Sequence, residues 1–142
     1  MAIKLNPYII FNDGQSAQAI ALYEKALGAK VDTLMRYGDA AAMGQKTPPE
    51  LKDHVMHSEL RIGDGVIMVM DASPERRVPV GANVQVTLHF DDAAELDRRF
   101  DALAAGGTVK VPPHDEFWGD RFGTLVDAFG MSWMFLGHPK KS

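Results

Sequence analysis

Residues 115–137, DEFWGDRFGTLVDAFGMSWMFLG, carry the clearest fold signal in the chain. Two short runs within this stretch, 121–126 and 132–136, are rich in the aliphatic and aromatic residues that strands favour. The Asp-Ala-Phe-Gly segment at 127–130 separates them and is typical of a tight turn. The stretch therefore predicts a β-hairpin near the C-terminal end of the chain.

A second hairpin of the same kind occupies the middle of the chain, with a Gly-Asp-Gly turn at 63–65. A strand, a helix and another strand precede each hairpin. The predicted elements are strands at 5–11, 29–37, 55–62 and 66–70 with a helix at 16–27 in the first half, and strands at 84–90, 108–111, 121–126 and 132–136 with a helix at 93–105 in the second.

Helical spacing of apolar residues supports both helices. Their apolar faces consist of Ile20, Tyr23 and Leu27 in the first and of Leu96, Phe100 and Leu103 in the second. Gly28 follows the first helix, where a left-handed residue ends helices most easily. Asp92 precedes the second helix, and Glu95 three residues later completes the pattern of a capping pair.

Both halves thus have the order β-α-β-β-β, which predicts an internal duplication of one supersecondary unit. The alternative is two generic α+β halves with a chance similarity. In either case the fold class is α+β. The expected modules span about 5–71 and 84–137 of one domain at 1–142, with irregular segments at 38–53 and 72–83.

Composition and charge exclude several functional classes. The chain has 142 residues, a formal net charge of -4 and no cysteine. Disulfides, thiolate metal sites and cysteine nucleophiles are excluded, and a cytoplasmic location is expected. An acidic chain without a basic face argues against nucleic acid as a partner. The sequence shows no signal peptide and no apolar run long enough for a membrane helix.

Several segments in this order resemble the vicinal oxygen chelate superfamily, which includes glyoxalase I, extradiol dioxygenases and bleomycin resistance proteins. The matching segments are Asn6-Pro7-Tyr8 with Phe11, SAQAIALYEKALGA, HSELRIGDGVIMVMDA and EFWGDRFGTLVDAFGMSWM. Within the superfamily they are most similar to the PhnB-like branch. The resemblance implies tandem modules that form a cupped mixed sheet, and a homodimer. Some PhnB-like proteins are called ubiquinone methyltransferases, but this chain has no glycine-rich loop to hold a methyl donor.

The resemblance also implies where a divalent metal would bind. In metal-dependent relatives each of four strands supplies one His, Glu or Gln ligand. These places fall here on Asn6, Met68, Gln85 and Met134. Two thioethers and two amides bind zinc, nickel or iron poorly. We therefore expect no metal cofactor.

A relocated metal site is the alternative. His57 and Glu59 stand two apart on a predicted strand and so face the same side. With His89 they would form a chemically reasonable ligand triad for a divalent ion, unless each simply faces solvent. Glu59 and Asp71 are also candidates for a general acid or base. His54, His114 and His138 are expected at the surface.

Methionines and aromatic residues predict a cleft for a small organic molecule. Flexible methionines line adaptable apolar pockets, although they also fill ordinary cores. Arg121 would meet an anionic or planar group of the ligand. The candidate ligand-binding residues are Tyr8, Met68, Met70, Phe117, Trp118, Arg121 and Met134. Trp133 alternates with Met134 and is expected in the core.

Three functions follow as hypotheses. The first is a protein that binds a small organic ligand without a metal. The second is a metal-dependent lyase, transferase or dioxygenase that uses the relocated ligands. The third is a vestigial cleft in a protein whose role is assembly. The sequence assigns no reaction and does not decide whether the protein is an enzyme.

Overall fold

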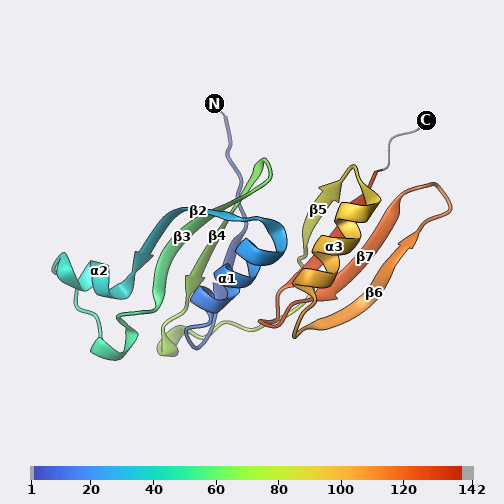
Figure 1. The fold of residues 1–142 in the computed structure, drawn as a ribbon. Coiled ribbons are helices and arrows are strands. Elements are labelled where there is room, and N and C mark those ends of the chain that lie inside the picture. The colour runs from blue at the N-terminus through green and yellow to red at the C-terminus, as the bar shows by residue number, and fades with distance from the viewer. Residues whose placement is uncertain (1, 139–142) are drawn as a thin grey trace. The chain divides into compact units, whose positions relative to one another are not determined.

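The computed structural model describes residues 2–138. The chain divides between Pro79 and Val80 into two compact units, each of which is described by itself (Figure 1). Each unit contains one four-stranded mixed sheet and one long helix.

In the first unit the sheet order is β1-β4-β3-β2. Strands β1 and β4 pair in parallel, and the other neighbours are antiparallel. The elements are β1 (Tyr8–Phe11), α1 (Ser16–Leu27), β2 (Lys30–Arg36), α2 (Tyr37–Ala42), η1 (Pro49–Leu51), β3 (Val55–Ile62), β4 (Gly65–Asp71) and η2 (Pro74–Arg76).

The second unit repeats this topology with the sheet order β5-β8-β7-β6. Here β5 and β8 are the parallel pair. The elements are β5 (Val86–Phe90), α3 (Ala93–Leu103), β6 (Thr108–Asp115), β7 (Arg121–Val126) and β8 (Ser132–Gly137). The predicted α+β class and the β-α-β-β-β order of both halves are confirmed.

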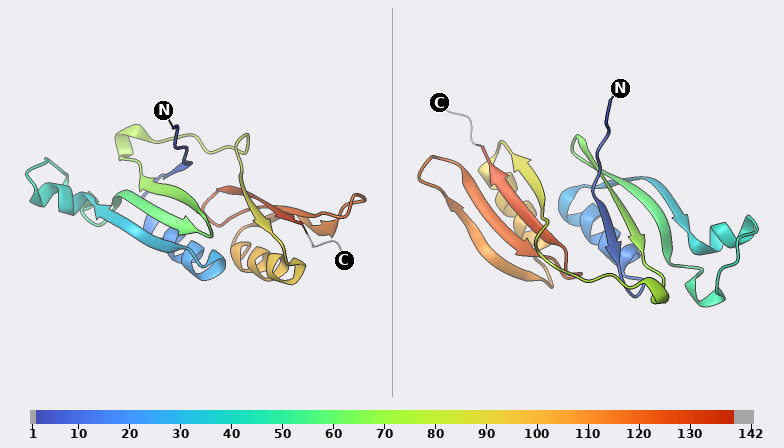
Figure 2. Two further views of the ribbon diagram at one scale, coloured as in Figure 1. Left: turned by 90° about the horizontal axis from the view of Figure 1, so that it is seen from above. Right: turned by 180° about the vertical axis from the view of Figure 1, so that it is seen from behind.

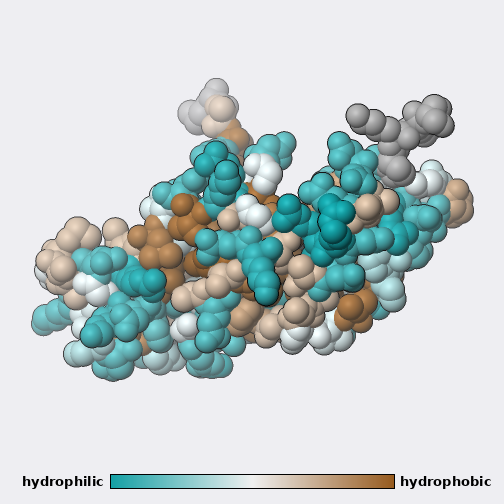
Figure 3. All heavy atoms as spheres, in the orientation of Figure 1, coloured by the Kyte–Doolittle hydropathy of each residue, from teal (hydrophilic) through white to brown (hydrophobic). Residues whose placement is uncertain are grey.

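Each long helix covers one face of its own sheet and leaves the other face open (Figure 2). Helix α1 packs on β3 and β4, and α3 packs on β5 and β8. The buried side chains lie between helix and sheet, and hydrophilic side chains cover much of the outer side of α3 (Figure 3). The largest fully buried side chains are Tyr23, Leu60 and Val69 in the first unit and Leu96, Phe100, Trp133 and Phe135 in the second. The prediction that Trp133 is a core residue is confirmed.

A buried aspartate joins the helix and the sheet in the first unit. Asp71, at the end of β4, is fully buried, and its carboxylate accepts hydrogen bonds from the Ser16 and Val55 amides at 2.9 and 2.8 Å. The N-cap residue of α1, Gln15, makes no side-chain cap of its own. Asp71 therefore accepts a hydrogen bond from an amide in the first turn of α1, although it lies on a strand distant in sequence. The positive end of the helix dipole favours a carboxylate at this place.

A second buried aspartate, Asp127, organises the turn between β7 and β8. Its Oδ1 accepts hydrogen bonds from the amides of Phe129 and Met131 at 2.9 and 3.0 Å. Its Oδ2 accepts one from the Trp133 indole at 2.9 Å. The turn predicted at 127–130 is therefore held by side-chain hydrogen bonds as well as by Gly130, whose φ is 90°.

Some predicted boundaries are wrong. The segment 38–53, expected to be a loop, contains the C-terminal part of α2 and all of η1. Helix α2 has only six residues, too few for an apolar periodicity, and the Asp39 carboxylate accepts a hydrogen bond from the Arg36 amide that precedes it. Strand β6 continues past its predicted end to Asp115, through two prolines that an edge strand with an irregular register tolerates.

The ends of other elements also differ from the prediction. Strands β1 and β5 begin later than expected, at Tyr8 and Val86. Asp92 is the N-cap of α3, as predicted, and accepts a hydrogen bond from the Ala94 amide at 3.0 Å. Glu95 instead forms an ion pair with Arg99 at 3.5 Å, one helical turn further along.

Candidate functional site on the open sheet faces

Several predicted site residues meet on the helix-free face of the first sheet. Tyr8 on β1 is the register partner of Met68 on β4, and Met68 is in turn the partner of Glu59 on β3. Thr33 on β2 completes this row across the four strands. Because side chains alternate along a strand, all four point away from α1. The row thus brings the candidate metal ligand Glu59 next to the candidate ligand-binding residues Tyr8 and Met68.

A second row lies beside the first. Ile10 on β1 is the register partner of Met70 on β4. His57 on β3 shares this side of the sheet with Glu59, two residues away. We call Tyr8, Ile10, His57, Glu59, Met68 and Met70 the open face of the first sheet.

A hydrogen bond spans the open face. The Tyr8 hydroxyl and His57 Nδ1 are 2.6 Å apart, although β4 lies between their strands. The two rings meet edge to face, with centroids 5.8 Å apart. Partial burial raises the pKa of Tyr8 above its ordinary value, and the neighbouring Tyr37 and Glu59 add to the effect. The neutral phenol is therefore the stable form of Tyr8.

The open face is apolar with few polar groups. Tyr8 and Ile10 are 39% and 38% exposed, which is high for large side chains in a sheet. Met68, Met70, His57 and Glu59 are partly buried. Such a mixture of apolar surface and a few polar groups is typical of small-molecule sites.

The side chains at the four inferred ligand positions are unsuited to binding a metal ion. Asn6 precedes β1, and its amide donates to the Val66 carbonyl at 3.0 Å. Gln85 precedes β5, and its amide donates to the Ala82 carbonyl at 3.2 Å. Both amides are thus used by the backbone nearby.

The register places other residues beside the two methionines. The partner of Met68 on the first strand of the module is Tyr8, and the partner of Met134 is Thr87. Thioethers with a phenol and an alcohol offer neither the imidazole nor the carboxylate that divalent first-row ions prefer. The donor groups at these places therefore do not fit the metal that the resemblance implies.

The relocated triad divides between the units. His57 and Glu59 lie on one face of the first unit, and His89 belongs to β5 of the second. Among residues 2–138, no three His, Asp or Glu side chains are grouped so that they could hold a metal ion. A site that combines His57, Glu59 and His89 stays a prediction.

The helix-free face of the second sheet is built in the same way. Met134 on β8 has Thr87 on β5 and Thr124 on β7 as register partners. Leu136, two residues further along β8, is the partner of His89. Met134 therefore occupies in its unit the place that Met68 occupies in the first, as predicted.

His89 takes part in a chain of polar contacts that the sequence did not reveal. Its Nδ1 lies 3.0 Å from Nε2 of His138, and Nδ1 of His138 lies 3.3 Å from an Asp120 carboxylate oxygen. Parallel pairing carries on past β8, because the His138 amide donates to the Phe90 carbonyl. Residue 138 was predicted to be surface, and its side chain is exposed. Only the pairing of β5 with β8 brings it to His89.

Phe117 and Trp118 lie in the connection between β6 and β7. Their rings meet edge to face with centroids 4.8 Å apart, and they are 96% and 56% exposed. The Trp118 indole donates to Asp120 at 3.0 Å. The pair is thus an exposed tip with one ring held in place, and its role in ligand binding stays a prediction.

Arg121 is already paired with two carboxylates. Its Nε and Nη2 donate to the two oxygens of Asp97 on α3 at 2.8 and 3.1 Å, and its Nη1 donates to Asp115 at 2.9 Å. The Asp97 hydrogen bonds, followed by those of Asp115, raise the pKa of the guanidinium. This fork-like geometry ties β7 to α3 and β6, so in this structure Arg121 holds the unit together.

The remaining histidines are His54 and His114. The register pairs His114 on β6 with Phe122 on β7, which is in turn the partner of Leu136 on the helix-free face of the second sheet. His54 is partly buried, and a Cβ atom built on Gly14 would lie 2.5 Å from its ring. His114 is exposed, as predicted. Its contact with the Pro112 carbonyl, and then its hydrogen bond with Glu116, raise the pKa of His114 above its ordinary value.

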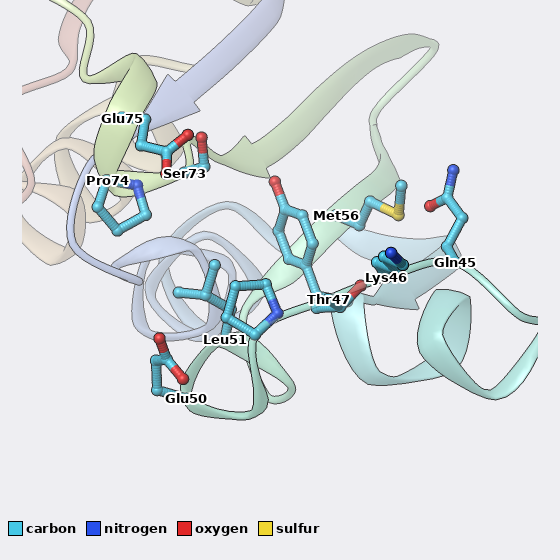
Figure 4. A pocket seen from close by; sticks show the side chains of 11 residues that line it. Gln45, Lys46, Thr47, Glu50, Leu51, Met56, Ser73, Pro74 and Glu75 are labelled. Atoms are coloured by element: carbon cyan, nitrogen blue, oxygen red, sulfur yellow. The ribbon is translucent and has the colours of Figure 1, made fainter.

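A hollow of about 410 Å³ opens elsewhere in the first unit, beside α2 and η1. Lys46, Thr47 and Met56 lie on one side of it and Ser73 and Pro74 on the other (Figure 4). Its wall includes Tyr37, whose hydroxyl donates to the Asp71 carbonyl at 2.9 Å. Burial, with a smaller effect of Asp71, raises the pKa of Tyr37. None of the predicted ligand residues lines this hollow.

No helix within residues 2–138 is both long and apolar enough to cross a membrane.

Comparison with known proteins identifies the family. Residues 6–135 match the Glyoxalase/Bleomycin resistance protein/Dioxygenase superfamily. Protein YjdN of Escherichia coli is 29% identical over 137 residues, which is 92% of each chain. The structure of PA1353 from Pseudomonas aeruginosa has 32% identity and a TM-score of 0.84, and the match covers 98% of this chain and all of that one.

The PhnB protein from Bacillus cereus is a more distant structural neighbour. It has 19% identity and a TM-score of 0.79 over 96% of this chain and 100% of its own. At that identity the likeness concerns the fold. Because the superfamily match spans nearly the whole chain and a relative above 30% identity is fully covered, the chain belongs to the glyoxalase/bleomycin resistance protein/dioxygenase superfamily.

Proposed function

We propose that this protein binds a small organic molecule on the open face of the first sheet, without a metal ion, as a PhnB-like member of its superfamily. The observation that carries the proposal is the open face itself. Apolar side chains from β1 and β4 stand there beside a tyrosine–histidine hydrogen bond and a carboxylate. For Met134 and the Phe117–Trp118 tip we propose a separate ligand contact within the second unit.

Physical chemistry favours a ligand over plain exposure for these side chains. Leaving Tyr8 and Ile10 exposed sacrifices the free energy of burial, about 25 cal/mol for each Å² of apolar surface. A bound molecule recovers part of this free energy when it covers them. Met68 and Met70 adapt to ligands of different shape because the methionine side chain is flexible and polarizable.

The metal-free part of the proposal rests on the donor groups. The family places hold two thioethers and two amides, and the register partners of the two methionines are a phenol and an alcohol. None of these groups offers a charge to offset a divalent cation. The proposal also includes a homodimer in the cytoplasm, and it includes neither nucleic acid nor a membrane as a partner. The dimer rests on the family resemblance.

Nuclear magnetic resonance of methyl-labelled methionines tests the ligand site. We expect apolar and aromatic molecules to shift the methyl signals of Met68 and Met70, which Met68→Leu and Met70→Leu variants assign. Met43 is 70% exposed and lies off the open face, so its signal is the internal control. Compounds that shift Met43 alone would contradict the proposal.

A metal-dependent enzyme is the second candidate, because His57 and Glu59 share one face. Its test is elemental analysis of untagged protein purified without chelators, and again after incubation with nickel, zinc, iron and manganese. Near-stoichiometric metal that His57→Ala abolishes would favour the enzyme. Metal uptake unchanged by His57→Ala would exclude the relocated triad.

A further inference from the structure

We propose that the ligand of the open face is an organic cation, such as an amine or amidine attached to an apolar group, and that Glu59 binds its charge. This inference rests on the proposed function and specifies the ligand class. It starts from the Glu59 carboxylate, which stands between Met68 and Thr33 in its row across the sheet.

Glu59 is partly buried and lacks a counter-charge. Within the described part of the first unit, its carboxylate has no hydrogen bond and no ion pair. Removing an ionised carboxylate from water is costly unless a partner compensates for the lost hydration. A site that keeps such a group next to an apolar surface is complementary to a ligand that brings the partner.

Arg61, Tyr8 and His57 have partners other than Glu59. Arg61, two residues along β3, forms an ion pair with Asp32 at 2.9 Å. The Tyr8 hydroxyl and His57 Nδ1 share their hydrogen bond at 2.6 Å. These contacts leave the Glu59 carboxylate available to a ligand.

The surroundings of Glu59 also suit a cation with an apolar body. The Tyr8 ring stands in the same row, and an aromatic face attracts a cation near it. The thioethers of Met68 and Met70 provide soft, polarizable contacts for the apolar part. An anionic ligand would instead meet the like charge of Glu59 at close range, which is unfavourable.

Three probes that share a naphthalene ring and differ in charge test the inference. They are 1-naphthylmethylamine, 1-naphthalenemethanol and 1-naphthoate, each titrated in EDTA so that no metal ion serves as the cation. Methyl signals of Met68 and Met70 report binding at the open face. We expect the amine to bind at least about tenfold more tightly than the alcohol, which corresponds to about 1.4 kcal/mol, and the carboxylate to bind most weakly.

The variant Glu59→Gln keeps the shape of the side chain and removes its charge. We expect it to abolish the preference for the amine over the alcohol. The matched control is Glu24→Gln, an exposed carboxylate on α1, which should leave the preference unchanged. The ranking of the three probes on the unaltered protein requires no variant, so it stands even if Glu59→Gln is poorly folded.

The outcomes separate this inference from the proposed function. Equal affinity of the amine and the alcohol at Met68 and Met70 would overturn the cation proposal and leave a small-molecule site. A preference for the amine that Glu59→Gln does not alter would remove Glu59 from the site. If no probe shifts either methionine, the cation proposal fails, and the compound screen of the proposed function then decides whether any ligand uses this face.

Discussion

At the scale of single residues, the role of a carboxylate depends on whether neighbouring groups donate hydrogen bonds to it. Asp71 and Asp127 are buried, and backbone amides or an indole satisfy their oxygens. These two aspartates stabilise the fold. Glu59 is on the open face of the first sheet without such partners, and we propose that a cationic ligand supplies one.

Replacing Asp71 should destabilise the protein strongly. Asp71→Ala leaves the buried Ser16 and Val55 amides without their acceptor, and each unsatisfied amide costs about 1–3 kcal/mol. We expect a loss of about 2–5 kcal/mol in urea unfolding. Asp64→Ala, in the exposed turn between β3 and β4, is the control and should change little. A loss for Asp71→Ala no larger than for the control would refute the structural role.

Tyr8 should ionise above pH 10.0, its ordinary pKa, because burial and then the charges of Tyr37 and Glu59 disfavour the phenolate. The folded state thus holds this proton more tightly than the unfolded state does. The corresponding stability is complete below pH 10.0 and is lost as the pH rises through the folded pKa. Tyrosine-labelled nuclear magnetic resonance measures the titration.

Two variants resolve the causes of this shift. Glu59→Gln and Tyr37→Phe should each lower the pKa of Tyr8, because each removes a neighbouring charge that opposes its ionisation. An unchanged titration in Glu59→Gln would show that the carboxylate does not act on Tyr8, and would also weaken the cation proposal.

At the scale of elements, the turns of the second unit depend on close backbone contacts. A Cβ atom on Gly107, at the start of β6, would lie 2.3 Å from the Val126 carbonyl oxygen. That oxygen belongs to the backbone of β7 and moves only if the strand pairing shifts. We therefore expect Gly107→Ala to lower the free energy of unfolding by about 1–3 kcal/mol.

The control for this prediction is Gly65→Ala at the start of β4. There the nearest atom to a new Cβ is the Ile62 carbonyl oxygen at 3.6 Å, an ordinary contact. Thermal and urea unfolding of both variants provide the measurement. If the two variants unfold alike, the close approach at Gly107 is absent.

The tip between β6 and β7 should matter for ligands and not for stability. Trp118 is 56% exposed, so Trp118→Ala should change the free energy of unfolding by no more than about 0.5 kcal/mol. We expect the same variant to lower the affinity for any ligand that quenches tryptophan fluorescence. Phe117→Ala provides a comparison at the adjacent ring. Unchanged ligand affinity in Trp118→Ala would remove this residue from the site.

At the scale of the whole molecule, the chain uses one topology twice, as β1-β4-β3-β2 and β5-β8-β7-β6. Each unit has its own core between a long helix and a sheet. Each also presents a helix-free face with a methionine at an equivalent place, Met68 or Met134. The repeated topology thus gives two related surfaces, and among residues 2–138 the tyrosine–histidine hydrogen bond lies on the first of them.

The assembly state is testable directly. From the family resemblance we expect a homodimer in solution. Light scattering coupled to size-exclusion chromatography over a range of protein concentrations measures its mass. A monomer at all concentrations would contradict this part of the proposal and leave the ligand site of the single chain to be tested by itself.

The sequence by itself determined the elements that depend on local patterns. Helix α1 spans Ser16–Leu27, as predicted, because its apolar spacing and Gly28 are local signals. Strands β3 and β7 also have their predicted ends. The repeated β-α-β-β-β order follows from these elements, whereas the family resemblance rests on particular sequence segments.

Only the tertiary structure decided which polar groups meet. The contact between Tyr8 and His57 depends on β4 lying between their strands, and residues 49 positions apart show no local sign of it. Arg121 looked available for a ligand until α3 brought Asp97 to its guanidinium. Periodicity along one element defines which residues share a face. Strand pairing and helix packing determine which faces lie together, and the chemistry of the site depends on this packing.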